Sequence, residues 1–239
     1  MLESFEKIPV KIYKNPTEGS NALAVQIAHL IKEKQGQNLP CVLGMATGAT
    51  PILLYKELVR MHKEEGLSFV NVVTFNLDEY YPMEPDSVNS YVRFMNEQLF
   101  NHIDILAENC YVPDGTLPKE EIRNYCDEYE AKIKAFGGID LQILGIGGNG
   151  HIGFNESGSL QNSKTRLVAL DHITRIAASG DFSGLENTPR TAITLGVKKI
   201  MEANSVAKEC LKDYFFPPEA LAIDTDVIFS PMPGGALTA

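Results

Sequence analysis

The chain has 239 residues, of which 44% are hydrophobic, and carries a formal net charge of -10. That content suffices for one α/β domain with a sizeable core, so we expect a single domain over residues 1–239. The acidic balance argues against a nucleic-acid partner, because phosphate backbones attract clustered Lys and Arg. No stretch reaches the roughly 18–20 apolar residues of a membrane span, and the first ten residues lack the apolar core of a signal peptide. We therefore expect a cytoplasmic protein with no membrane partner, and the 4 cysteines, none in a C-x-x-C pair, are expected to be free thiols.

Apolar residues at strand or helix spacing predict elements that alternate along the chain. Strands are expected at residues 8–13, 40–45, 71–76, 139–144, 166–170, 191–195 and 222–229. Helices are expected at residues 20–34, 51–65, 90–102 and 118–136, the second beginning at Pro51 with Thr50 as its cap. This alternation implies right-handed crossovers and a parallel sheet. The predicted fold is α/β: a three-layer, mostly parallel open sheet with helices on both faces, in a modified Rossmann-like arrangement.

Three polar loops follow expected strands, at the sheet edge where open parallel sheets bind ligands. The first spans residues 46–51 and reads Ala-Thr-Gly-Ala-Thr-Pro. Free backbone N–H groups and the positive end of the following helix predict an anion seat here, with hydroxyl donors from Thr47 and Thr50. An ordinary capped turn is the alternative, and the loop lacks the Gly-Lys-Ser/Thr ending of a Walker loop.

The second loop spans residues 76–80 and reads Asn-Leu-Asp-Glu-Tyr. Paired acids at a strand end are candidates for general-base catalysis or metal binding. We expect Asp78 on a loop outside the core. A solvated turn suits Glu79 better than Asp78, and spacing alone leaves open which of the two faces a pocket.

The third loop spans residues 145–156 and is rich in glycine. Gly145, Gly147 and Gly150 match the G-x-G-x-x-G pattern of dinucleotide-binding folds, and Asp171 lies about 20 residues further on. A dinucleotide site is therefore one interpretation of this loop.

The residues that follow these glycines disfavour a dinucleotide site. That pattern requires a helix to open within the glycines, but Gly153 interrupts this segment. His151, Asn155 and Glu156 stand where the cofactor helix would begin. A single histidine is more often structural, but one among four glycines with a glutamate five residues on indicates a catalytic loop.

Together, the stretches 43–51, 72–80 and 145–156 resemble the glucosamine-6-phosphate deaminase family. The similarity is continuous over about residues 40–200, and three spaced motifs in order are more specific than any one of them. The related 6-phosphogluconolactonases share the fold and a similar glycine–histidine loop. The runs at 78–80 and 154–156 look like the deaminase branch.

The resemblance implies a reaction and a set of catalytic residues. The family converts glucosamine 6-phosphate and water into fructose 6-phosphate and ammonia, and requires neither a metal nor a redox cofactor. Asp78 would be the base that moves a proton between C2 and C1, and His151 would help to open the pyranose ring. Glu156 would orient His151. Asn149 occupies a position where some relatives carry Asp, and an amide there cannot ionise.

The resemblance also implies how a phosphorylated amino sugar would be held. Residues matching the phosphate and sugar contacts of the family are Thr47, Gly48, Ala49, Thr50 and Gly147, with Lys208 as a candidate phosphate lysine. The family includes hexamers and smaller forms, so a homo-oligomer is a further expectation.

The match departs from the family pattern in three places. Gly180 stands where an arginine that grips phosphate is expected, with Arg175 and Arg190 as candidate substitutes. No hydrophobic strand is expected before Lys208, and residues 203–239 are unlike the family's C-terminal part. Val168 stands where some members carry an allosteric lysine. We therefore also weigh a related sugar-phosphate isomerase, a lactonase-like hydrolase and a non-catalytic sugar-phosphate sensor.

Overall fold

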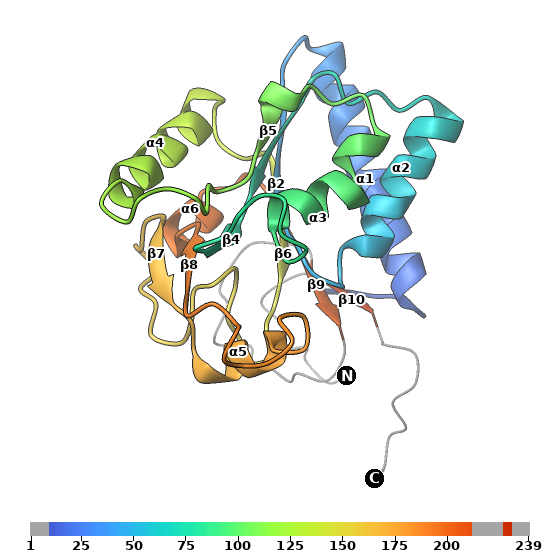
Figure 1. Ribbon diagram of the computed structural model, residues 1–239. Coiled ribbons are helices and arrows are strands. Elements are labelled where there is room, and N and C mark those ends of the chain that lie inside the picture. Colours follow the sequence, from blue (N-terminus) through green and yellow to red (C-terminus); the bar gives the residue numbers. More distant parts are fainter. Residues whose placement is uncertain (1–9, 212–226, 231–239) are drawn as a thin grey trace, which may run out of the picture.

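The computed structural model describes residues 10–211 and 227–230 of the chain (Figure 1). Within these residues the strands form two sheets, a seven-stranded parallel sheet and a three-stranded antiparallel sheet. The strand order is β1-β10-β9-β6-β2-β3-β5 in the main sheet and β4-β8-β7 in the small sheet. The predicted α/β fold with a mostly parallel sheet is confirmed. The separate small sheet was not expected.

The strands agree with most of the predicted segments. The main sheet contains β1 (Val10–Ile12), β2 (Cys41–Met45), β3 (Val72–Asn76), β5 (Cys110–Tyr111), β6 (Leu141–Gly145), β9 (Val206–Leu211) and β10 (Val227–Ser230). The small sheet contains β4 (Asp78–Tyr81), β7 (Arg166–Ala169) and β8 (Thr191–Thr194). Residues 8, 9 and 222–226 of the predicted strands lie outside the described residues.

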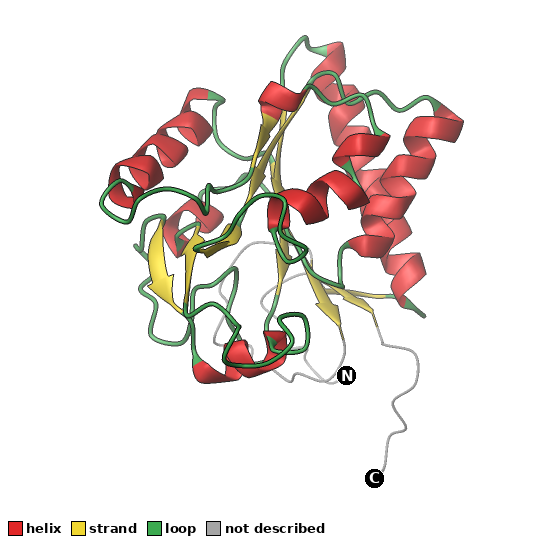
Figure 2. Cartoon of the chain, viewed as in Figure 1, coloured by secondary structure: helices red, strands yellow, loops and turns green. Residues whose placement is uncertain are grey.

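The helices lie on both sides of the main sheet (Figures 1 and 2). They are α1 (Pro16–Gly36), α2 (Ile52–Glu65), α3 (Tyr91–Gln98), α4 (Ile122–Ala135), α5 (His172–Ala178) and α6 (Val197–Met201). Helices α1 and α2 pack together on one side, and α4 lies on the other (Figure 1). Among the described helices, none is long and apolar enough to cross a membrane.

Local capping explains where the helices begin. Helix α1 starts earlier than its apolar spacing predicts, because Asn15 accepts the N–H of Glu18 and Pro16 takes the first position. The predicted cap of the second helix is wrong. Pro51 itself is the N-cap of α2, and no side chain caps this helix. The first N–H groups of α2 therefore lack a side-chain acceptor.

The centre of the main sheet is buried on both faces. All five residues of β2 and all five of β3 are buried, as expected for parallel strands covered by helices. Gly44 pairs with Gln142 of β6, and a Cβ on Gly44 would overlap the Gln142 side-chain amide. The glycine therefore gives a polar side chain room inside the sheet.

The chain passes from the main sheet to the small sheet at Leu77. The Leu77 N–H donates to the Met45 carbonyl of β2, and its carbonyl accepts the N–H of Leu195 after β8. Asp78 then pairs with Thr194 as the first residue of β4. The expectation of Asp78 on a loop outside the core is wrong, because this polar segment has a strand partner far along the chain.

Strand β9 also corrects an expectation. Lys208 was expected to have no strand before it, but Val206 and Ala207 are buried and begin β9. The backbone of Lys208 pairs with Leu144 of β6 and with Val227 of β10. A short strand whose partners lie on both sides does not need a long apolar run, since its backbone is satisfied by the sheet.

Candidate active site

The two neighbouring acids of β4 face different surroundings. Glu79 is buried, and its carboxylate accepts the Ser90 hydroxyl at 3.0 Å and the N–H groups of Tyr91 and Val92 at 2.8 and 3.3 Å. Glu79 therefore supplies the hydrogen-bond acceptor for backbone N–H groups in the first turn of α3. The expectation of a solvated turn at Glu79 is wrong, because the start of a helix supplies the donors that water would otherwise provide.

Asp78 points towards the glycine–histidine loop. A Cβ placed on Gly153 would lie 3.3 Å from Asp78 Oδ2 and 2.9 Å from Thr194 Oγ1. Asp78 is 7% exposed. Burial, and then the charge of Glu79, raise the pKa of Asp78 to about 8. A carboxyl group with this pKa exchanges protons near neutral pH.

His151 is held by a polar network behind its ring. Its Nδ1 lies 3.2 Å from Thr174 Oγ1 and 3.4 Å from Glu156 Oε2. Burial lowers the pKa of His151 below its ordinary value, although Glu156 acts in the opposite direction. The imidazole is therefore mainly neutral at neutral pH.

Asn149 and Glu156 are the inner part of this network. Asn149 Nδ2 donates to Glu156 Oε2 at 2.8 Å, and Asn149 Oδ1 accepts the N–H of His151 at 3.3 Å. The other oxygen, Glu156 Oε1, accepts the N–H of Asp171 at 3.1 Å, at the start of α5. One side of Glu156 thus faces His151 while the other fixes α5.

Gly147 makes room for the imidazole. A Cβ on Gly147 would overlap the His151 ring at Nε2 and Cε1, whereas a Cβ on Gly145 would meet nothing within 4 Å. The resemblance assigned Gly147 to substrate contact. Its position in the structure gives a direct reason for glycine, which is the close approach of the His151 ring to the backbone.

The loop at 46–51 lies near these groups through Tyr91. The Thr47 side chain lies beside that of Tyr91 and opposes the burial that raises the Tyr91 pKa. Gly48, with φ of 105°, and Ala49 are exposed. Because no side chain caps α2, this loop presents a free helix N-terminus next to a hydroxyl group. Such a terminus favours an anionic ligand.

Aromatic side chains join the three loops. The Tyr80 ring lies 5.2 Å from Tyr91 and 5.2 Å from Phe154, and Phe154 lies 6.2 Å from His151. Phe182 adds a further edge-to-face contact with Tyr80 at 5.0 Å. Asp78, His151 and Thr47 are thus brought to one region at the carboxyl ends of β2, β3 and β6.

The basic residues considered for phosphate binding differ in their surroundings. The Arg175 guanidinium donates to the carbonyls of Leu185, Thr188 and Pro189, so it secures the segment before β8. Arg190 is exposed and precedes Thr191, which pairs with Tyr81 at the end of β4 away from Asp78. The backbone of Lys208 lies beside β6, but its side chain lies outside the described residues. Gly180 is exposed and adds no cation.

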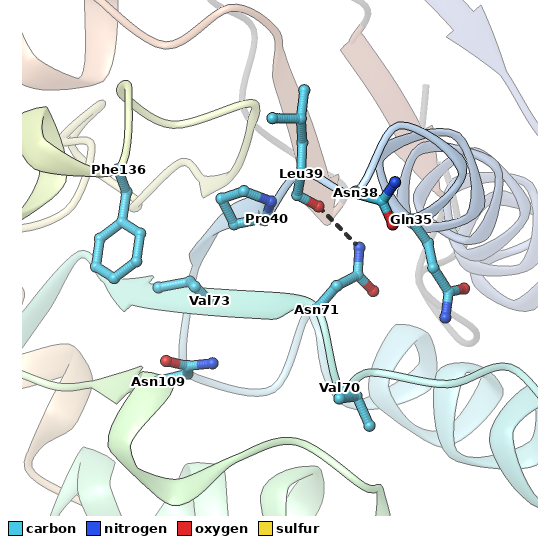
Figure 3. A pocket seen from close by; sticks show the side chains of 9 residues that line it. All are labelled: Gln35, Asn38, Leu39, Pro40, Val70, Asn71, Val73, Asn109 and Phe136. Atoms are coloured by element: carbon cyan, nitrogen blue, oxygen red, sulfur yellow. Dashed lines mark hydrogen bonds between the residues drawn. The ribbon is translucent and has the colours of Figure 1, made fainter.

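A hollow of about 380 Å³ opens at the other end of the main sheet (Figure 3). Pro40 and Asn71, which precede β2 and β3, lie in its wall, and Asn71 Nδ2 donates to the Leu39 carbonyl. The nine lining side chains are amides or apolar groups, and none is titratable. The acid–base groups therefore lie at the carboxyl ends, away from this hollow.

Sequence reasoning missed several residues of the site. Tyr91 and Thr174 were not singled out for chemistry, and Thr194 was seen only as part of a strand. Tyr91 lies in a stretch, 89–91, that resembles the family, and Thr174 opens a Thr-Arg pair that the family also has, but the sequence gives neither residue a role. Only the approach of distant segments brings them next to Asp78 and His151. Among the described residues, no group of three His, Cys, Asp or Glu side chains is arranged to hold a metal ion.

The fold and this arrangement define an α/β protein with an acid–base site at the carboxyl ends of a parallel sheet. The family model for glucosamine-6-phosphate isomerases/6-phosphogluconolactonase matches residues 14–208. The chain belongs to this family.

Individual relatives differ in how much of their length the chain spans. It is 49% identical over 206 residues to a glucosamine-6-phosphate deaminase-like protein of Bacteroides thetaiotaomicron, covering 86% of this chain but 31% of that protein. It is 44% identical over 184 residues to the glucosamine-6-phosphate deaminase of Thermoanaerobacter pseudethanolicus, covering 77% of this chain and 72% of that enzyme.

Solved structures agree with this membership. A monomeric glucosamine-6-phosphate deaminase superposes with a TM-score of 0.84 at 33% identity, covering 92% of this chain and 96% of that one. The 6-phosphogluconolactonase of Thermotoga maritima gives a TM-score of 0.69 at 21% identity, covering 94% and 100%. The second likeness concerns the fold alone.

Proposed function

We propose that the chain is a glucosamine-6-phosphate deaminase, which converts glucosamine 6-phosphate and water into fructose 6-phosphate and ammonia. One observation carries the proposal. A buried acid, a neutral imidazole and an uncapped helix N-terminus lie together at one end of the sheet. Relatives named glucosamine-6-phosphate deaminase, at 44% identity over most of the chain, support it.

Asp78 is the proposed base for the isomerisation. Moving a proton between C2 and C1 requires one group that accepts it and then returns it, which suits a carboxyl with a pKa near the working pH. The pKa of about 8 for Asp78 meets this requirement. General acid–base groups of this kind typically contribute about 10²–10⁴-fold to the rate.

His151 is the proposed group for ring opening. Its Nε2 lies over Gly147 on the side away from Thr174 and Glu156, so this nitrogen is the one available to a sugar oxygen. Glu156 would stabilise the charge that His151 gains when it takes up a proton.

The loop at 46–51 is the proposed phosphate seat. The free N–H groups of α2 and the Thr47 hydroxyl are suitable donors to an anion. Arg175 is committed to backbone carbonyls, so the remaining cation candidates are Arg190 and Lys208.

The test is a coupled assay that measures ammonia and fructose 6-phosphate from glucosamine 6-phosphate. Wild type should turn over, and Asp78→Asn should lose about 10²-fold or more of kcat. A small panel with other aldose phosphates and 6-phosphogluconolactone serves as the comparison. Turnover of one of these instead of glucosamine 6-phosphate would assign another family reaction, and binding without any turnover would indicate a sensor.

A further inference from the structure

We infer that Thr174 is a positioning residue that holds neutral His151 in the tautomer with the proton on Nε2. The Thr174 hydroxyl does this by donating a hydrogen bond to His151 Nδ1. The inference rests on the proposed function only for the role of the ring, because the hydrogen bond itself is a property of the free protein.

Thr174 occupies an unusual place in its helix. Among the residues of α5 it is the buried one, while Ile173 and Ile176 on the same short helix are 58% and 51% exposed. Of the apolar side chains of α5, these two isoleucines face solvent, while Ala178 at the end of the helix packs on the cluster around Phe154. Thr174 directs its hydroxyl at the imidazole, at 3.2 Å from Nδ1.

Within residues 10–211 and 227–230, the hydroxyl proton of Thr174 has one acceptor, His151 Nδ1. Asn149 Nδ2, the other polar atom near Thr174 Oγ1 at 3.5 Å, can only donate. His151 Nδ1 can accept if it carries no proton. If Nδ1 carried the proton instead, Thr174 Oγ1 would receive two donors, and its own buried hydrogen would have no partner among the described residues.

Glu156 is the second partner of the same nitrogen. Its Oε2 lies 3.4 Å from Nδ1, where it favours the protonated ring, and it already accepts from Asn149 at 2.8 Å. When the ring takes up a second proton, that proton goes to Nδ1, where Glu156 supplies the opposite charge. Thr174 thus selects the neutral tautomer, and Glu156 stabilises the protonated ring.

The tautomer decides how the ring meets a substrate. With the proton on Nε2, the free side of His151 presents a hydrogen-bond donor to a sugar oxygen. With the proton on Nδ1, the same side would present an acceptor. A single hydroxyl on α5 therefore sets the direction of the first hydrogen bond to the sugar.

The experiment is ¹⁵N NMR of the histidine rings in the ligand-free protein at a pH where His151 is neutral. His151→Gln identifies the signal by its loss. Wild type should show an unprotonated Nδ1 and a protonated Nε2. Thr174→Val, which keeps the shape but removes the hydroxyl, should shift the population towards protonated Nδ1, and Thr174→Ser should restore the wild-type pattern.

Two results would overturn the inference. One is a wild-type ring with the proton on Nδ1. The other is the same tautomer in wild type and in folded Thr174→Val. Should Thr174→Val fail to fold, the same NMR measurement is made on Glu156→Gln, in which His151 should keep the proton on Nε2. Absence of deaminase turnover would leave these spectra unchanged, so the two proposals fail separately. In an active enzyme, Thr174→Val should lower kcat about tenfold with little change in KM.

Discussion

At the scale of single residues, Asp78 and Glu79 are consecutive in β4 but contact different parts of the molecule. Successive side chains of β4 point to opposite faces, so Glu79 meets the start of α3 while Asp78 meets the glycine–histidine loop. The dipeptide Asp-Glu does not predict these different surroundings, because they depend on where α3 begins in space.

The buried acid makes stability depend on pH. The folded pKa of Asp78, about 8, lies above its ordinary value of 3.8, so the folded state holds an extra proton between these values. Stability from this group is complete below about pH 4 and is lost as the pH rises through about 8. Asp78→Asn removes the effect. We expect the free energy of unfolding of the variant, taken relative to that of wild type, to rise by on the order of a few kcal/mol between pH 5 and pH 9.

Denaturant unfolding at several pH values measures this difference. Asp114→Asn removes a half-buried acid of a turn far from Asp78 in sequence and is the control for the loss of a carboxylate elsewhere. A constant difference between wild type and Asp78→Asn at all pH values would contradict the expected burial of a protonated acid.

Two of the glycines before His151, Gly145 and Gly147, provide a matched pair. Gly147→Ala should displace the imidazole, because the added methyl overlaps the ring, and should reduce kcat about 10²-fold. Gly145→Ala meets nothing within 4 Å and should leave kcat nearly unchanged. Steady-state kinetics of both variants, with circular dichroism to show folding, makes the comparison. Equal losses in the two would mean that the ring position does not matter.

At the scale of elements, the pairing of β2 with β6 predicts a coupled pair of substitutions. Gly44→Ala should destabilise by about 1–3 kcal/mol, because its methyl overlaps the Gln142 amide inside the sheet. In a Gln142→Ala background the same change should cost much less, which gives a coupling energy on the order of 1 kcal/mol.

A double-mutant cycle by denaturant unfolding measures this coupling. Gly36→Ala at the end of α1 meets nothing within 4 Å and serves as the control, neutral or slightly stabilising. Additive costs for Gly44→Ala and Gln142→Ala would show that the sheet adjusts around the methyl.

Most elements of the main sheet were predictable, because β2, β3 and β6 are short apolar runs between clear helical patterns. Strand β4 was not. Its residues Asp-Glu-Tyr-Tyr lack the apolar run of a buried strand, and it is a strand because β8, more than a hundred residues later, pairs with it. The same reason hid Tyr91 and Thr174, whose importance comes from contacts between segments distant in sequence.

At the scale of the whole molecule, the alternation of strands and helices predicted the parallel sheet, but not its strand order or the second sheet. The motifs predicted which loops lie at the carboxyl ends. They did not predict that α2 starts without a side-chain cap or that Arg175 is engaged by carbonyls. Those facts depend on local geometry that composition and spacing do not determine.

We expect no activation of the proposed enzyme by an amino-sugar phosphate. Arg166 donates to Asn155 at 3.0 Å and to Ser159 at 3.2 Å, and Val168 packs beside the buried apolar cluster around Phe154. Arg166 is thus engaged by neighbouring polar groups and Val168 carries no charge, so this pair offers no free cation to a second ligand. Initial rates should be hyperbolic in substrate and unchanged by N-acetylglucosamine 6-phosphate. Sigmoidal kinetics that this compound abolishes would contradict the expectation.

The backbone of Leu77 has a mechanical consequence for the molecule. Its N–H is bonded to one sheet and its carbonyl to the segment that follows a strand of the other. Sliding of the small sheet against the large one would therefore have to break a bond immediately before Asp78. The residue before Asp78 is thus bonded to both parts of the molecule, so movements of the surrounding loops leave Asp78 in register with the main sheet.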